Sequence, residues 1–298
     1  MFRRCLCICL SLAAVVMLFS CNKGKDSPVL LKASAEQQST GNKSEKVAEP
    51  KEEEKTPPVN PEYEKIKIVV SKMSPRFKEV VKIPESNYDE FLADLHSVLE
   101  EEKTFRSDDL SLYYLIDKKH FVDENYVPKD LVKVSNNSHY NVSRNDLSLR
   151  PDVEEALTVM ADAALEDGIK LMVSSTYRSY EYQKNLFARY VREDGEELAS
   201  RYSAKPGTSQ HQLGVAIDFG SVTDDFALTK MGKWLNQHSE EYGWSLSFPQ
   251  DYEDVTGFMW ECWHFRYIGK PACVFQNKWF GDVQQFMIEF VDEWKKTI

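Results

Sequence analysis

The sequence changes character near residue 61, and this change limits where a folded core can form. Residues 21–61 are rich in Lys, Glu, Ser, Pro and Gln, and almost no apolar residue follows Leu31. Such a segment cannot bury enough apolar surface to offset the entropy lost on ordering, so we predict a flexible linker. Its Lys and Glu are mixed in sign, which favours a solvated spacer over a binding tail. A folded domain must therefore come from other parts of the chain.

We predict that residues 1–20 are a secretory signal peptide. Two arginines precede an uncharged, mostly apolar run over residues 5–19, which is shorter than the roughly 20 residues of a membrane-spanning helix. The motif LFSC at residues 18–21 resembles the bacterial lipobox, so Cys21 is the expected lipidation site. The alternative is an ordinary signal peptide with a chance cysteine. Lipidation implies a lipoprotein anchored to a membrane of the cell envelope, facing the periplasm or another extracytoplasmic space.

The predicted signal peptide and lipidation site determine which cysteines remain in the folded part. Of the six cysteines, three lie in the signal segment and one is Cys21, which leaves Cys262 and Cys273 for the folded part. In an oxidising compartment such a pair can form a disulfide. The sequence does not establish that the two side chains converge, so a disulfide and two free thiols are equally compatible with it.

The net charge of the chain excludes one class of binding partner. The chain has 37 Lys and Arg against 48 Asp and Glu, a formal net charge of −11. Duplex nucleic acid is therefore an unsuitable partner, because phosphate binding needs concentrated positive charge. A hydrophobic content of 42% is enough for a buried core. Nothing in the composition indicates an oligomeric state.

Apolar spacing predicts both helices and strands. The predicted helices cover most of residues 62–109 and then residues 152–164, 181–191 and 287–294. The predicted strands are residues 112–116, 171–175, 216–219 and 263–267. Regular βαβ units and glycine-rich phosphate loops are lacking, which favours the α+β class. We therefore expect a helical N-terminal extension over residues 62–109, followed by the main domain over residues 110–298.

Polar residues gather in three segments that adjoin predicted strands. The segments are residues 175–183, 209–218 and 261–264. Two of them supply His211, Asp218 and His264. Two neutral imidazoles and one carboxylate can hold Zn²⁺ and leave a fourth tetrahedral position for water, as a catalytic zinc requires. A lone histidine is more often a hydrogen-bonded core or surface residue, and spacing alone leaves that alternative open.

Glu261 lies three residues before the proposed ligand His264. From there it is close enough to accept a proton from a metal-bound water. In a regular strand, however, side chains three residues apart point to opposite faces. The proposed chemistry therefore predicts a bend or a helical turn between Glu261 and His264.

Taken together, these segments resemble the VanY-type D-alanyl-D-alanine carboxypeptidases. The pattern S-x-H-x-x-G-x-A-x-D occupies residues 209–218 and E-x-W-H occupies residues 261–264. Further likeness, within about residues 110–285, lies in the motifs YRSY (177–180, with Gln183), KPGTS (205–209) and WHFRY (263–267). These enzymes belong to the zinc peptidases grouped with D-Ala-D-Ala dipeptidases and the hedgehog fold. The resemblance implies a hedgehog/D-Ala-D-Ala-peptidase-like α+β fold, with a small antiparallel sheet flanked by helices.

The resemblance also implies a role for each motif residue. The zinc ligands would be His211, Asp218 and His264. Glu261 would be the general base, and Arg178 would steady the oxyanion. Ser209 and Gln183 would help to hold the substrate.

The implied activity is zinc-dependent hydrolysis of the C-terminal D-alanine of peptidoglycan stem peptides. An L,D-carboxypeptidase or a stem-peptide endopeptidase on the same fold would share every catalytic residue. A non-catalytic, muropeptide-binding lipoprotein is the third reading, although a binding module has no need of Glu261. Thr176, Ser247 and Cys262 depart from the family, which usually has Gly, Arg and Pro there. These departures concern the shape of the substrate pocket and leave the ligands and the base in place.

Overall fold

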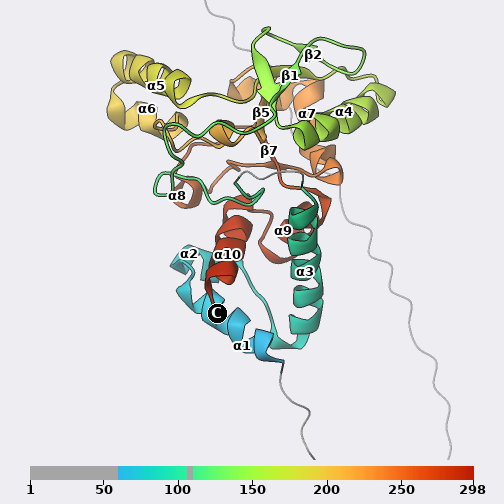
Figure 1. The fold of residues 1–298 in the computed structure, drawn as a ribbon, viewed down its shortest axis with the longest axis vertical. Helices are drawn as coiled ribbons and strands as arrows, with labels where there is room; N and C mark the ends of the chain where they lie inside the picture. The colour runs from blue at the N-terminus through green and yellow to red at the C-terminus, as the bar shows by residue number, and fades with distance from the viewer. Residues whose placement is uncertain (1–59, 106–109) are drawn as a thin grey trace, which may run out of the picture. The chain divides into compact units, whose positions relative to one another are not determined.

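A five-stranded sheet organises the protein in this computed structural model, which describes residues 60–105 and 110–298 (Figure 1). The strands are β2 (Asn141–Val142), β4 (Met172–Ser175), β5 (Ala216–Phe219), β7 (His264–Tyr267) and β6 (Trp244–Leu246), in that spatial order. The pairs β4–β5, β5–β7 and β6–β7 are antiparallel, whereas β2 and β4 are parallel. The predicted α+β class, with a small and mostly antiparallel sheet, is confirmed.

The sequence analysis did not predict strand β6 or the parallel pair of β2 and β4. Between β2 and β4 the chain forms β3 (Leu147–Leu149), which pairs with β1 (Val132–Val134) in a separate two-stranded sheet. It then forms α4 (Pro151–Glu166) and enters β4. This is a βα crossover, and it was missed because β2 spans two residues, too few to show a strand pattern.

Helices flank the sheet as predicted. They are α4, α5 (Tyr180–Asp194), α6 (Glu196–Tyr202), α7 (Lys230–His238) and the single turn α8 (Glu253–Thr256). Short 3-10 helices span Glu85–Asn87, Gln210–Leu213, Asp224–Leu228 and Ser239–Tyr242. The helix predicted over residues 152–164 is α4, which has Pro151 in its first turn and buries one apolar face. In Figure 1, α5 and α6 lie side by side, apart from α4 and α7.

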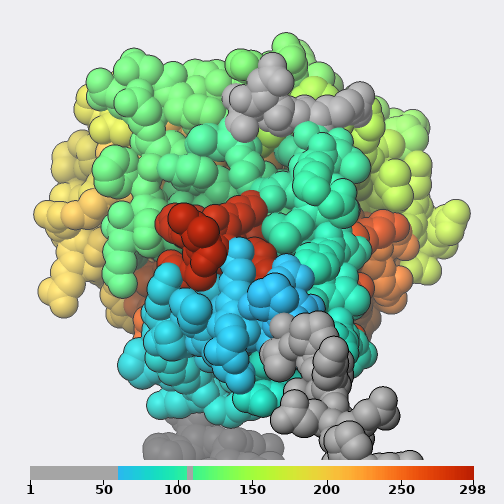
Figure 2. Space-filling view, turned by 60° about the horizontal axis from the view of Figure 1, so that its bottom comes forward, coloured from blue at the N-terminus to red at the C-terminus, as the bar shows by residue number. Residues whose placement is uncertain are grey.

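A second helical layer joins the N-terminal residues to the C-terminus. It consists of α1 (Pro61–Lys72), α2 (Pro75–Val80), α3 (Tyr88–Thr104), α9 (Lys270–Trp279) and α10 (Gln284–Lys296). Helix α3 packs against α9, and α1 packs against α10. Figure 2 shows the C-terminal residues, in red, bordered by the blue residues of the first helices. Residues 61–104 thus share a core with the C-terminal helices.

Aromatic side chains fill this layer. Phe91 is fully buried, and its ring centroid lies 5.1 Å from that of Phe275 and 5.2 Å from that of Phe290. Edge-to-face and tilted aromatic pairs at such distances are favourable beyond the area they bury. The layer therefore depends on rings contributed by both ends of the described chain.

Replacing Phe91 with alanine is expected to destabilise the fold by about 3–5 kcal/mol, the usual cost of removing a buried ring. The free energy of unfolding, measured by urea denaturation, checks this value. Phe121→Ala is the matched control, because Phe121 is 69% exposed and its loss should change stability by less than about 0.5 kcal/mol. Equal effects of the two substitutions would contradict the packing described.

The strand predicted over residues 112–116 is wrong. This segment is irregular, although Leu112 and Ile116 are buried. The buried Arg266 donates from Nη2 to the carbonyls of Leu112 (2.8 Å) and Tyr114 (3.0 Å). These acceptors are therefore bonded to a side chain and are not paired in a sheet. The apolar pattern reflected burial and not a strand.

Two further predictions concern the segment before the folded domain and the two cysteines within that domain. The signal peptide, Cys21 and all but the last two residues of the linker lie outside the described residues. Within the described part of the chain, no helix has the length and apolar character that crossing a membrane requires. Cys262 and Cys273 are both buried free thiols, so the disulfide that the sequence left open is not formed in this structure.

Candidate active site

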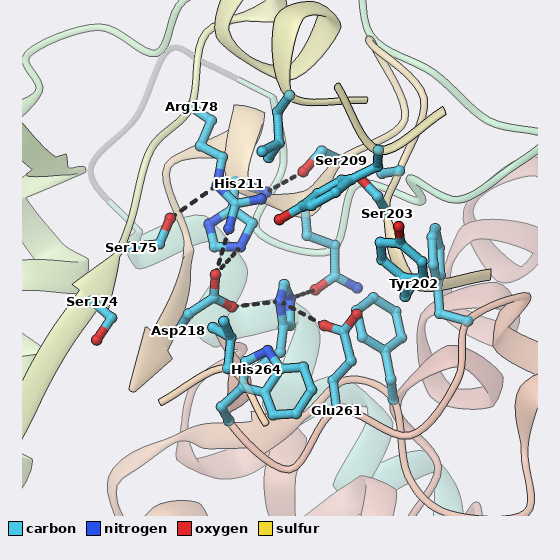
Figure 3. Close-up of a pocket in the computed structure, with 18 of the residues that line it drawn as sticks. Ser174, Ser175, Arg178, Tyr202, Ser203, Ser209, His211, Asp218, Glu261 and His264 are labelled. Carbon is cyan, nitrogen blue, oxygen red and sulfur yellow. Dashed lines mark hydrogen bonds and ion pairs between the residues drawn. The ribbon is translucent and has the colours of Figure 1, made fainter. Parts of the chain in front are cut away.

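His211, Asp218 and His264 converge at one end of the paired interior strands β5 and β7. His211 lies in the 3-10 helix Gln210–Leu213, Asp218 lies on β5, and His264 begins β7 directly opposite Asp218. One ligand atom from each lies within 4.8 Å of the others, and all three side chains are buried. Figure 3 shows them facing one another. Among residues 60–105 and 110–298, this is the one group of three such side chains close enough to share an ion.

The loop before β5 places His211 through a capped turn. Ser209 caps this turn, because its hydroxyl accepts a hydrogen bond from the His211 N–H at 3.3 Å. Gly214 ends the turn with a left-handed φ of 69°, a conformation that glycine adopts without strain. A Cβ there would lie 3.2 Å from the Arg150 and Leu131 side chains. The motif glycine therefore lets the chain turn tightly from His211 into β5.

The hydrogen bonds of both histidines suit a metal. His211 Nδ1 lies 2.6 Å from the Thr176 carbonyl and must donate to it, so a neutral ring carries its lone pair on Nε2. That buried Nε2 makes no hydrogen bond and lies 3.2 Å from Asp218 Oδ2. His264 Nε2 is bonded to Gln210 Oε1 (3.1 Å), and its Nδ1 faces Asp218 Oδ1 (3.0 Å). The lone pairs of His211 Nε2 and His264 Nδ1 thus point toward the Asp218 carboxylate, an arrangement that suits Zn²⁺. The Thr176 carbonyl and the Gln210 side chain fix the orientation of the two rings.

The charges around this group keep it ready to bind a cation. Burial, and then the nearby Arg178 charge, lower the pKa of His211 to about 4, so the ring is neutral at pH 7. Burial alone would raise the pKa of Asp218, but its interaction with His211 and the Arg178 charge outweigh burial and hold that pKa well below its usual range. The site thus presents a neutral imidazole and an ionised carboxylate at neutral pH.

Arg178 lies beside the metal group and is held from three sides. Its Nη2 pairs with Asp218 Oδ2, its Nε donates to Ser175 Oγ at 2.9 Å, and its Nη1 approaches Gln183 Oε1 at 3.4 Å. The guanidinium side chain is 18% exposed. A fixed, partly exposed cation in this position can interact with negative charge that develops on a bound substrate.

A turn brings Glu261 to the same site. The N–H of His264 donates to the carbonyl of Glu261 at 3.1 Å, so the bend predicted between these residues is confirmed. Glu261 Oε2 lies 3.6 Å from His264 Nδ1. Burial, and then the Asp218 charge, raise the pKa of Glu261 well above its usual range. A carboxyl group with a raised pKa can hold and release a proton during a reaction.

A cavity of about 810 Å³ opens onto these residues. Its walls include His211, Asp218, His264, Glu261, Arg178 and Ser209. Gln183 does not line the cavity: it is 1% exposed and donates through Nε2 to the Ala204 carbonyl at 2.7 Å. In this structure the amide of Gln183 is used inside the protein and supports Arg178, and its role in holding the substrate stays a prediction.

Some site residues were missed by sequence reasoning. The backbone carbonyl of Thr176 and the side chain of Gln210 each hold one histidine, and Ser175 holds Arg178. All three lie in the polar segments that the sequence singled out, so their position in a motif was the available signal. Their roles depend on which atom faces which ring, and residue spacing does not encode this.

Comparison with known proteins identifies the family. The family model described as "VanY: D-alanyl-D-alanine carboxypeptidase" matches residues 146–270. A bifunctional D-Ala-D-Ala dipeptidase and D-Ala-D-Ala carboxypeptidase, VanXYC of Enterococcus gallinarum, is 32% identical over 55% of this chain and 88% of its own length. The chain belongs to the VanY-type D-alanyl-D-alanine carboxypeptidase family. The resemblance read from the motifs is thus confirmed.

Two other VanY-type comparisons add detail. The putative carboxypeptidase YodJ of Bacillus subtilis is 36% identical over 53% of this chain, but the match spans only 60% of YodJ. The solved LdcB LD-carboxypeptidase is 31% identical, with a TM-score of 0.51, over 62% of this chain and 85% of its own. Members of the VanY-type family are zinc metallopeptidases, and the buried His-Asp-His group fits that metal.

Proposed function

We propose that this protein is a zinc-dependent D-alanyl-D-alanine carboxypeptidase that removes the C-terminal D-alanine from peptidoglycan stem peptides. Membership of the VanY-type family supports this activity. The observation that carries the proposal is the placement of a buried His-Asp-His group, Glu261 and Arg178 on the walls of one cavity. A module that only binds muropeptides does not need a buried carboxyl group beside a metal site.

Zinc held by His211, Asp218 and His264 would supply Lewis-acid polarisation of the scissile carbonyl and of the attacking water. Glu261 accepts a proton from that water and passes it to the departing amine, a cycle that suits a buried carboxyl group. A cation beside Glu261 opposes the effect of burial and favours the ionised base. Arg178 stabilises the negative charge that develops on the carbonyl oxygen.

Digestion of muropeptides tests the activity. The purified protein is incubated with pentapeptide and tetrapeptide stems, with added zinc or with a chelator, and the products are measured by mass spectrometry. We expect zinc-dependent loss of one D-alanine from the pentapeptide. Muropeptide binding without release of D-alanine would favour the non-catalytic alternative, and cleavage within the stem would favour an endopeptidase.

The second candidate is an L,D-carboxypeptidase, which the likeness to the LdcB structure favours. Such an enzyme would remove the terminal D-alanine of the tetrapeptide and leave the pentapeptide intact. Both activities would use the same metal group and the same Glu261. The pentapeptide and tetrapeptide arms of the digestion therefore distinguish them directly.

Replacing Arg178 with alanine is expected to lower kcat by about 10²–10³-fold, the usual cost of losing one charge-stabilising donor. Arg178→Lys should recover only part of this loss, because lysine lacks the planar fork. Zinc content is measured in parallel, since Arg178 also pairs with Asp218. Arg192→Ala, on the exposed side of α5, is the control. An unchanged kcat in Arg178→Ala would contradict the proposed role.

We further propose that the mature protein is a lipoprotein anchored through Cys21 and exposed on the extracytoplasmic side of a membrane. The support is the apolar run before the LFSC motif at residues 18–21 and the polar spacer after it. Labelling of cells with a fatty-acid analogue should mark the wild type and leave Cys21→Ala unmarked. Equal labelling of both would contradict the anchor.

A further inference from the structure

A row of buried polar side chains leads from His264 to the start of α10. Gln210, Ser247 and Gln284 form this row, and their exposed fractions are 6%, 2% and 1%. Gln284 is the first residue of α10 and lies outside the segment matched by the family model, which ends at residue 270. Buried polar groups are costly unless they are bonded, so the hydrogen bonds along the row constrain it strongly.

These hydrogen bonds run in one direction. The backbone carbonyl of Ser245 can only accept, so Gln284 donates to it from Nε2 at 3.3 Å. Gln284 Oε1 therefore faces Gln210 and accepts from its Nε2 at 3.4 Å. This leaves Gln210 Oε1 facing the ring of His264, 3.1 Å from Nε2. Each amide orientation follows from the one before it.

The last amide decides which nitrogen of His264 carries the proton. An amide oxygen only accepts, so His264 must donate to Gln210 from Nε2. A neutral ring then has its lone pair on Nδ1, the atom that lies 3.0 Å from Asp218 Oδ1. Ser247 Oγ also donates to Gln210 Oε1, at 2.7 Å, and holds that oxygen in place.

We propose that Gln284, Gln210 and Ser247 are positioning residues that fix the tautomer and ring orientation of His264 for zinc. This inference rests on the proposed ligand role of His264 and requires no particular substrate. Outer partners of a metal ligand set its orientation and basicity, and losing one typically lowers metal affinity by about 10–100-fold. Gln284, which lies outside the matched segment, thus helps to complete the metal site.

The N-terminal helices support this arrangement. Phe286, two residues after Gln284, packs against Phe77 of α2 with ring centroids 5.4 Å apart. Helix α1 also packs against α10. The segment over residues 61–104 therefore holds the helix whose first side chain orients Gln210.

The test measures zinc affinity by chelator competition on the purified full chain. Gln284→Met and Ser247→Ala remove the polar groups without adding bulk, and each should weaken zinc binding by about tenfold. In a Gln210→Met background, His264 has already lost its acceptor, so neither substitution should weaken zinc binding further. A loss of general stability would not show this dependence on Gln210.

Gln276→Met is the matched control. Gln276 is equally buried, at 1% exposure, but it accepts from Ser245 Oγ at 2.9 Å and donates to Asp282. Its replacement should leave zinc affinity within twofold of the wild type. The absorption spectrum of the cobalt-substituted protein gives a second readout, which should change in Gln284→Met and Ser247→Ala and stay unchanged in the control.

Unchanged zinc affinity in Gln284→Met and Ser247→Ala would overturn the inference. So would losses that persist in the Gln210→Met background or that equal the loss in the control. If Gln284→Met does not fold, the double-mutant cycle of Ser247→Ala and Gln210→Met is by itself enough to test the inference. A wild type that releases no D-alanine, while its variants show the expected zinc affinities, would refute the proposed function and leave this inference standing.

Discussion

Glu261→Gln is expected to retain one zinc per chain, while its release of D-alanine falls by about 10³-fold. The amide has nearly the shape of the carboxylate but cannot take a proton, and general acid–base catalysis typically contributes about 10²–10⁴-fold. Retention of zinc is expected because the three proposed ligands are unaltered. Initial rates on a pentapeptide stem and elemental analysis of the same sample provide the two measurements.

Glu241→Gln is the control for this experiment, because the Glu241 side chain is 62% exposed and its partner is the surface residue His238. Its turnover should equal that of the wild type. Near-normal activity in Glu261→Gln would show that another group accepts the proton. Loss of zinc from that variant would instead place Glu261 among the ligands.

His211→Ala is expected to lose both zinc and turnover. Removing one of three protein ligands leaves an incomplete site, and Asp218 also loses its contact with His211. Zinc at 100 times its dissociation constant should stabilise the wild type by about 2.7 kcal/mol. This zinc-dependent gain, measured by thermal unfolding with and without a chelator, should vanish in the variant.

His238→Ala serves as the control, because His238 is a surface histidine bonded to Glu241 at 2.9 Å. It should retain zinc, activity and the chelator-sensitive part of the stability. Stoichiometric zinc in His211→Ala would count directly against the ligand assignment, whatever its activity. A variant that keeps zinc but loses turnover would move His211 from metal binding to substrate positioning.

The convergence of His211, Asp218 and His264 could be predicted because all three lie in short sequence motifs. Asp218 and His264 lie in segments predicted as strands, the family resemblance implied both as zinc ligands, and antiparallel pairing places them opposite each other. The turn before His264 followed from the requirement that Glu261 face the same side. Motifs that give both the residue types and their spacing therefore predicted most of the site residues.

The contacts of Gln183 could not be predicted from the same motifs. Its place three residues after YRSY at 177–180 suggested a residue facing the cavity, but α5 turns its side chain inward to Ala204 and Arg178. The strand expected over residues 112–116 failed for a related reason. Arg266, far away in the sequence, binds the carbonyls of that segment. Contacts between distant residues decided both cases.

The connection between α10 and His264 also lay beyond sequence reasoning. Gln284 stands 20 positions after His264, in a helix whose sequence shows only ordinary amphipathic spacing. A glutamine at a helix start has no distinctive pattern, and amide direction is determined by neighbours in space. The packing of residues 61–104 against the C-terminal helices in one aromatic core accompanies its placement at the site.

The separate placement of the two thiols has a practical consequence for anyone making this protein. Cys262 directs its Sγ toward the carbonyls of Thr223 and Asp224, at 3.7 Å each, and Cys273 is buried in α9. No covalent cross-link contributes to the described fold. Recombinant material expressed without residues 1–20 in a reducing bacterial cytoplasm should reach the native state with no oxidative refolding step.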